Sequence, residues 1–151
     1  MEDFARSGAF VVVFLVVLGI LLIPAIFYLL TLQKALERCD PQSRTTSPGS
    51  VWLLLIPLFN IVYQFIVVSN IAQSLGNEFN RRGITNVERE PGKTLGIAFC
   101  VLNIAGIIPV IGIVFGLAGL VCWILYWVKI ADYSNKIALP LPPAQYPQIP
   151  T

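Results

Sequence analysis

The sequence contains no histidine, and this absence removes several kinds of chemistry at once. Histidine is the commonest metal ligand, the usual general base and the axial ligand of most haems. The three cysteines form no motif, because Cys39 lies near a polar turn while Cys100 and Cys122 lie in apolar stretches as small packing residues. The sequence therefore predicts no enzyme, no catalytic residue, no cofactor and no metal.

Charged residues are also scarce. Only 12% of the 151 residues are charged and 56% are hydrophobic, whereas soluble domains have about 25% charged and about 45–50% apolar residues. The net charge of +2 is too small and too dispersed to indicate a nucleic-acid partner. The composition predicts an integral membrane protein whose first partner is the lipid bilayer.

Three long stretches carry no charge at all, at residues 7–33, 45–77 and 94–128. A helix needs about 20 residues to cross a bilayer, and the first stretch is too long for a signal-peptide core. The third would be roughly 52 Å long as one helix, against a hydrocarbon core of about 30 Å. Gly106, Pro109 and Gly112 at its middle therefore predict a turn between two helices.

These stretches predict an all-α, multi-pass fold of four transmembrane helices in a single domain over residues 1–136. The helices are expected at about 8–32, 51–75, 94–108 and 112–129, with the last two forming a tight hairpin. A re-entrant hairpin over 94–128 is the alternative, because each of its arms is short. Residues 137–151 are rich in proline and predict an extended tail.

The distribution of Lys and Arg indicates the orientation of this four-helix arrangement. Seven of the ten cations fall on the side of the N-terminus. The other three, Lys34, Arg38 and Arg44, fall on the opposite side. The positive-inside rule therefore predicts that both termini are cytoplasmic.

The predicted second helix carries a row of polar side chains. Polar groups do not face lipid tails without cost, so we expect the other helices to pack around this one. The candidate polar face consists of Asn60, Gln64, Asn70, Gln73, Ser74 and, from the third helix, Asn103. Small residues at Gly96, Gly112, Gly116 and Gly119 predict close helix packing, either within the hairpin or between two copies of the chain.

Two motifs resemble a set of uncharacterised bacterial multi-spanning membrane proteins. They are Pro-Gly-Ser-Val-Trp-Leu-Leu-Leu-Ile-Pro-Leu-Phe-Asn at 48–60 and Trp-Ile-Leu-Tyr-Trp-Val-Lys-Ile-Ala at 123–131. The similarity covers roughly residues 30–136 and implies a location in the bacterial inner membrane. It implies no activity, cofactor or catalytic residue.

Two functions remain open from the sequence. The first is a non-catalytic accessory or scaffold subunit that binds another membrane protein or a second copy of itself. The alternative is a small channel or carrier for a polar or amphiphilic solute, along a path lined by amide side chains. A proton-coupled exporter is disfavoured because the charge-free stretches contain no carboxylate.

Overall fold

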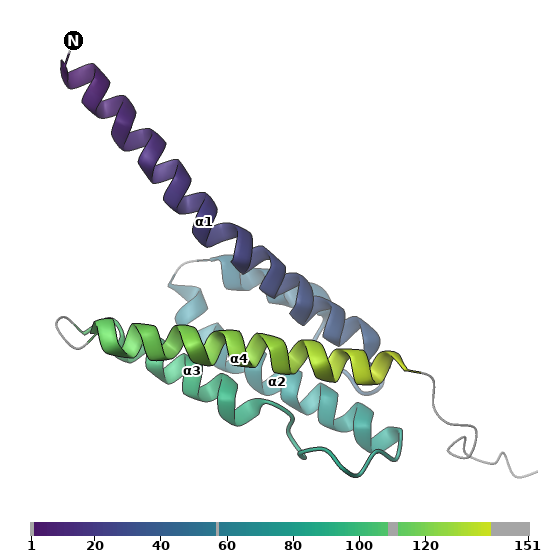
Figure 1. Cartoon of the computed structure of the whole chain (residues 1–151). Helices are drawn as coiled ribbons and strands as arrows, with labels where there is room; N and C mark the ends of the chain where they lie inside the picture. Colours follow the sequence, from purple (N-terminus) through teal and green to yellow (C-terminus); the bar gives the residue numbers. More distant parts are fainter. Residues whose placement is uncertain (1, 57, 109–111, 140–151) are drawn as a thin grey trace, which may run out of the picture. The chain divides into compact units, whose positions relative to one another are not determined.

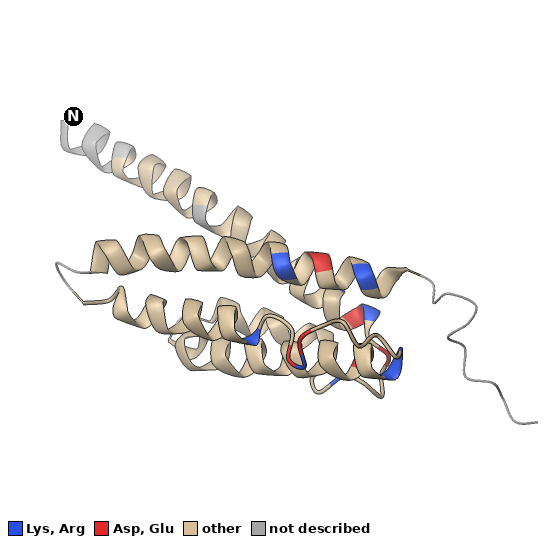
Figure 2. Ribbon diagram, turned by 60° about the horizontal axis from the view of Figure 1, so that its bottom comes forward, with Lys and Arg blue, Asp and Glu red and all other residues tan. Residues whose placement is uncertain are grey.

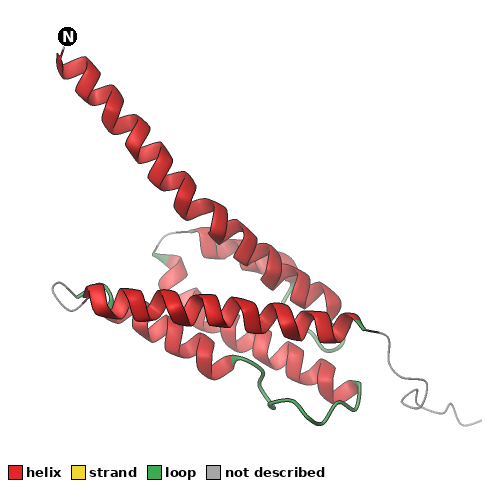
Figure 3. Cartoon of the chain, viewed as in Figure 1, coloured by secondary structure: helices red, strands yellow, loops and turns green. Residues whose placement is uncertain are grey.

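The computed structural model describes residues 2–56, 58–108 and 112–139, and every regular element in these ranges is helical. The chain forms α1 (Glu2–Arg38), the short 3-10 helix η1 (Pro48–Leu55), α2 (Phe59–Arg81), α3 (Lys93–Ala105) and α4 (Gly112–Ala138) (Figure 1). The described part of the chain contains loops but no strand (Figure 3). The predicted all-α class is therefore confirmed.

Two of the helices are long and apolar enough to cross a membrane. They are Phe10–Arg38, within α1, and α4, Gly112–Ala138. α3 is apolar but shorter, with 13 residues. The structure thus agrees with a helical membrane protein and provides two candidate crossings, whereas the sequence predicted four.

The chain divides into two compact units, Met1–Leu30 and Thr31–Thr151. The first unit is the longer part of α1, and most of its described apolar side chains are exposed, with Phe10 70% and Phe14 65% accessible, whereas Tyr28 and Leu29 near its end are buried. The second unit holds the remaining elements and has its own core.

The core of the second unit is built around α2. This helix contacts η1, α3 and α4, in agreement with the central place predicted for it. Its buried positions include Val68, Ile71 and Leu75, which recur at helical spacing on one face. Tyr126 and Ile130 of α4 are completely buried as well.

The chain breaks just before α2, within the segment over 51–75 that was predicted to be one transmembrane span. Ile56 has an extended backbone, with φ −78° and ψ 112°, as expected for a residue that precedes a proline. Pro57 itself lies outside the described residues. Leu58 then has φ 53° and ψ −50°, a sparsely populated conformation that costs a non-glycine residue about 1–3 kcal/mol. The backbone reverses here, and α2 begins at Phe59.

α3 and α4 pack together along their lengths, and three of the four predicted packing glycines lie at close approaches. A Cβ on Gly96 would lie 2.5 Å from Val68 Cγ1, and one on Gly119 would lie 3.5 Å from Leu102 Cβ. A Cβ on Gly112 would meet the Gly106 carbonyl oxygen. Nothing lies within 4 Å of the corresponding position on Gly116, so its packing role stays a prediction.

The predicted boundaries at both ends of the hairpin segment shift slightly. α3 spans 93–105 where 94–108 was expected, and residues 109–111 lie outside the described part. α4 starts at the expected Gly112 but continues to Ala138, well past residue 129. Of the predicted tail, residues 140–151 lie outside the described part.

Charged side chains in the second unit gather toward one end of the helices. In Figure 2 the Lys, Arg, Asp and Glu positions lie where α2 and α4 end and α3 begins, and the opposite end is free of them. The opposite end comprises the turn before α2 and the junction between α3 and α4. The second unit therefore has a charged end and an apolar end.

Candidate functional site

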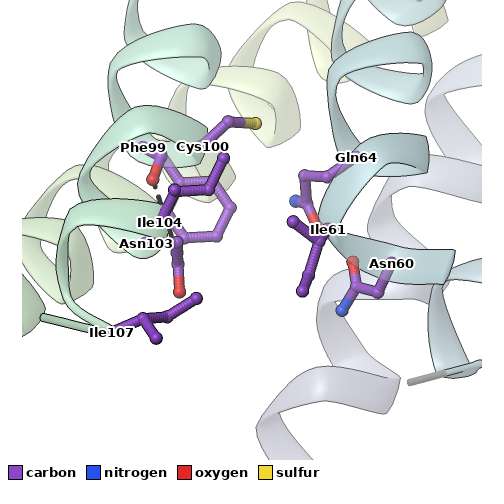
Figure 4. Close-up of a pocket in the computed structure, with 8 residues that line it drawn as sticks. All are labelled: Asn60, Ile61, Gln64, Phe99, Cys100, Asn103, Ile104 and Ile107. Carbon is purple, nitrogen blue, oxygen red and sulfur yellow. Dashed lines mark hydrogen bonds between the residues drawn. The ribbon is translucent and has the colours of Figure 1, made fainter. Parts of the chain in front are cut away.

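A cavity of about 220 Å³ lies between α2 and α3, toward the apolar end of the second unit (Figure 4). Three of the six predicted polar residues line it, namely Asn60 and Gln64 from α2 and Asn103 from α3. The rest of the lining is mainly apolar and consists of Ile61, Phe99, Cys100, Ile104 and Ile107.

The helix spacing of the amides places them at this cavity. Asn60 and Gln64 are four residues apart, so they lie on the same face of α2, one turn from each other. α3 touches α2 at Gly96 and Val68, where the missing side chain of glycine allows a close approach. The cavity lies farther along the two helices, where Phe99 and Ile104 are among the larger side chains that line it.

The side chains at the cavity remain accessible. Asn60 and Gln64 are half-buried, and Asn103 is exposed. The Asn103 Nδ2 donates to the carbonyl oxygen of Phe99 at 3.4 Å, which is a long hydrogen bond that leaves the amide oxygen available. An amide both donates and accepts hydrogen bonds. The cavity can therefore hold a neutral polar group inside an apolar rim.

The other predicted polar residues lie elsewhere on α2. Ser74 is buried and receives a hydrogen bond from the backbone N–H of Thr45 at 3.0 Å. Its Oγ donates to the Asn70 carbonyl oxygen at 2.7 Å. Gln73 is exposed and borders a separate hollow together with Arg89 and Glu90. The predicted polar face is therefore divided among a cavity, a loop contact and a surface.

A buried carboxylate, which was not among the predicted site residues, lies at the charged end. Glu78 has no exposed side-chain surface. Its oxygens accept hydrogen bonds from Arg82 Nε at 2.7 Å, Arg81 Nη2 at 3.0 Å and the Asp40 backbone N–H at 3.0 Å. Burial alone would raise the pKa of Glu78, but these hydrogen bonds outweigh it and lower the pKa to about 2.

The residues around Glu78 join the ends of three helices. Arg82 Nη1 donates to the carbonyl oxygen of Ile137, near the end of α4, at 2.6 Å. Arg38, the last residue of α1, donates to Ser134 Oγ at 2.8 Å. Arg81 forms an ion pair with Asp40 at 3.3 Å. These contacts hold the three helix ends together, and we call Glu78, Arg81, Arg82, Asp40 and Arg38 the clamp. In the sequence, only the spacing of Glu78, Arg81 and Arg82 within one helix indicated such a group.

The clamp does not activate the neighbouring thiol. Cys39 is buried and its Sγ donates to the Ala35 carbonyl oxygen at 3.4 Å. Burial, with a further contribution from the Glu78 charge, raises its pKa to about 12, so the thiol stays protonated at neutral pH. Within the described ranges, no group of three or more Cys, Asp or Glu side chains is placed to hold a metal ion.

No protein-family model, curated protein or solved structure matches the chain.

Proposed function

We propose that the chain is a non-catalytic integral protein of the bacterial inner membrane that acts as an accessory or scaffold subunit. The amide-lined cavity between α2 and α3 is where it binds the transmembrane helix of a partner. One observation carries the proposal, which is that Asn60, Gln64 and Asn103 converge on an accessible cavity within the charge-free part of the chain.

The physical reason is the cost of a polar side chain that faces hydrocarbon. A polar side chain exposed to lipid gains from any neighbour that offers a hydrogen bond, and interhelical hydrogen bonds stabilise helix association by about 0.6–2 kcal/mol each. The cavity offers three amides from two helices. Its apolar rim includes Ile104 and Ile107, which are 43% and 66% exposed and provide surface for van der Waals packing.

The partner is a membrane helix that carries a polar side chain, either from another protein or from a second copy of this chain. A helix places one side chain in such a cavity and packs its neighbours against the rim. The volume of about 220 Å³ accommodates one or two side chains and lies below the range of about 300–1,000 Å³ typical of pockets for small molecules. The size favours a side chain over a complete solute.

A carrier or channel for an amphiphilic solute is the second candidate, because the same amides and rim also suit a polar head with a short alkyl chain. The two functions differ in what the cavity holds after purification. A subunit retains a stoichiometric protein partner or a second copy, whereas a carrier binds a lipid-like molecule and moves it between leaflets or across the bilayer.

The test is purification in a mild detergent, followed by measurement of mass and composition. We expect the unmodified chain to elute with a stoichiometric partner or as a self-oligomer, and the double variant Asn60→Leu plus Gln64→Leu to lose it. Gln73→Leu is the matched control, because it removes an amide from the same helix outside the cavity.

A monomer without any protein partner would contradict the subunit proposal. In that case the same variants are tested for solute flux in liposomes. Flux that falls in the double variant but not in Gln73→Leu would establish the carrier instead.

A further inference from the structure

The segment that contains η1 and the first half of α2 folds back on itself. Thr45, just before η1, binds Ser74, well inside α2, through its backbone N–H at 3.0 Å. Its Oγ1 also donates to the Asn70 carbonyl oxygen at 2.9 Å. The chain therefore leaves this point along η1, reverses at Leu58 and returns along α2 (Figure 1). Residues 48–81 form a helical hairpin with both ends on the same side.

α3 and α4 form a second hairpin that opens in the same direction. At its open end, Lys129 Nζ forms an ion pair with Glu88 at 3.0 Å, and a Cβ on Gly92 would lie 3.3 Å from Ile130. At its closed end, Gly106 and Gly112 meet, one on each arm.

Contacts at the charged end hold the open ends of the two hairpins together. Arg82, just past the end of α2, binds the Ile137 carbonyl near the end of α4, and the Asp40 N–H binds Glu78. The loop over residues 39–47, the loop over 82–92 and the end of α4 therefore all lie at one end of the second unit.

Each hairpin has one arm, η1 or α3, that is too short to cross a bilayer. η1 has 8 residues and α3 has 13, which correspond to about 16 Å and about 20 Å. α4 as a whole has 27 residues, but its charge-free part, from Gly112 to Val128, is about 26 Å long. A hydrocarbon core is about 30 Å thick. Neither closed end carries a charge, because residues 45–77 and 94–128 contain no Lys, Arg, Asp or Glu.

We infer that residues 48–81 and 93–138 enter the bilayer from one side as two re-entrant hairpins, and that α1 is the one helix of the described chain that crosses. The surface of both hairpins contacts the acyl chains, and the charged end lies among the lipid headgroups. The inference rests on the membrane location proposed above but not on any partner.

The distribution of charge agrees with this arrangement. Nine of the ten Lys and Arg residues lie from residue 34 onward, and therefore on the side of the charged end. Only Arg6 precedes α1's apolar stretch, and Glu2 and Asp3 accompany it. The positive-inside rule makes the charged end cytoplasmic and the N-terminal residues external. In the four-helix prediction, by contrast, Lys34, Arg38 and Arg44 were external.

Cysteine labelling distinguishes the two topologies. Cys39, Cys100 and Cys122 are replaced by alanine in the full chain, and single cysteines are introduced at Gln42 and Asn86, both of which are exposed. A membrane-impermeant maleimide is applied to spheroplasts of a bacterial host before and after permeabilisation. Circular dichroism and thermal unfolding confirm that each variant is folded.

We expect both Gln42→Cys and Asn86→Cys to react several-fold more strongly after permeabilisation, because both loops are cytoplasmic. An epitope tag placed before Met1 should be accessible to antibody on intact spheroplasts. Labelling of Gln42→Cys in intact spheroplasts, with Asn86→Cys protected, would overturn the inference and restore four crossings. It would leave the subunit proposal standing, since no partner is involved.

The closed ends provide an independent measurement. Leu58 and Ile107 are 86% and 66% exposed, and they lie beside the two reversals of the chain. We expect Leu58→Cys and Ile107→Cys to stay unlabelled in intact spheroplasts, because hydrocarbon surrounds them. Labelling of either from the outside would show that its hairpin reaches the external surface, and would refute the re-entrant arrangement.

Discussion

Replacing Glu78 by glutamine should destabilise the folded chain more than any other single change to a carboxylate in its described part. The substitution preserves the size of the side chain and removes its charge. Arg81 and Arg82 then keep positive charges beside a neutral amide, and the amide NH₂ faces donors instead of accepting from them. Removing one partner of a buried ion pair typically costs about 3–5 kcal/mol.

The exposure of the two arginines narrows the expected loss of stability. The side chains of Arg82 and Arg81 are 17% and 48% exposed, so water partly solvates the charges that remain. We therefore expect a loss of stability of about 3 kcal/mol, at the low end of this range. The lowered pKa of Glu78 leads to a similar figure, since a fall from 4.5 to about 2 corresponds to about 3 kcal/mol at 1.36 kcal/mol per pKa unit.

The lowered pKa of Glu78 also determines how its contribution to stability depends on pH. The carboxylate of Glu78 is more acidic when folded than when unfolded, so its contribution to stability is complete above pH 4.5 and is lost as the pH falls toward 2. The difference in unfolding free energy between the unmodified chain and Glu78→Gln should therefore be largest at neutral pH. It should shrink steadily below about pH 4.5.

The assay is thermal unfolding in a mild detergent, followed by circular dichroism at pH 7 and at pH 3. A loss of about 3 kcal/mol should lower the midpoint by roughly 6–12 °C for a chain of this size. Glu90→Gln is the matched control, because Glu90 pairs with Lys93 at 2.7 Å but is 39% exposed. Its loss should cost under about 1 kcal/mol. Equal effects of the two substitutions, or a pH-independent difference for Glu78→Gln, would refute the reasoning.

Three further substitutions test the helix packing and the contact between the loop and α2. Gly96→Ala should lower the free energy of unfolding by about 1–3 kcal/mol, because its Cβ would lie 2.5 Å from Val68 Cγ1. Gly116→Ala, with nothing within 4 Å of the new Cβ, should raise it by up to about 1 kcal/mol. The same unfolding assay compares the two, and equal effects would contradict the predicted contact. Ser74→Ala removes the acceptor of the Thr45 N–H and should lower the free energy of unfolding by about 1–2 kcal/mol. The backbone N–H of Thr45 should also exchange its hydrogen faster. Unchanged exchange would show that the loop does not depend on this hydrogen bond.

Periodicity and composition predicted the parts of this fold that depend on near neighbours. The helical class follows from apolar stretches without charge, and α4 begins at Gly112 as expected. Asn60 and Gln64 could be placed on one face because they are one turn apart. The close approach of two helices at Gly96 was also predicted, because small residues favour close helix contacts.

The contacts between distant residues could not be predicted in this way. An apolar 3-10 helix followed by an α-helix has the same composition as one long helix, so the reversal at Leu58 left no periodic signal. The bond between Asp40 and Glu78 joins residues 38 positions apart. Sequence spacing within one helix contains no information about such a pair, and the four-helix prediction therefore placed the loop over residues 39–47 far from Glu78.

The gathering of charge at one end of the second unit has a consequence for biosynthesis. In the inferred topology, loops 39–47 and 82–92 stay on the side where the ribosome works, so no charged loop after α1 has to be carried through the lipid. The two apolar hairpins could then insert without passing a polar loop through a translocation pore.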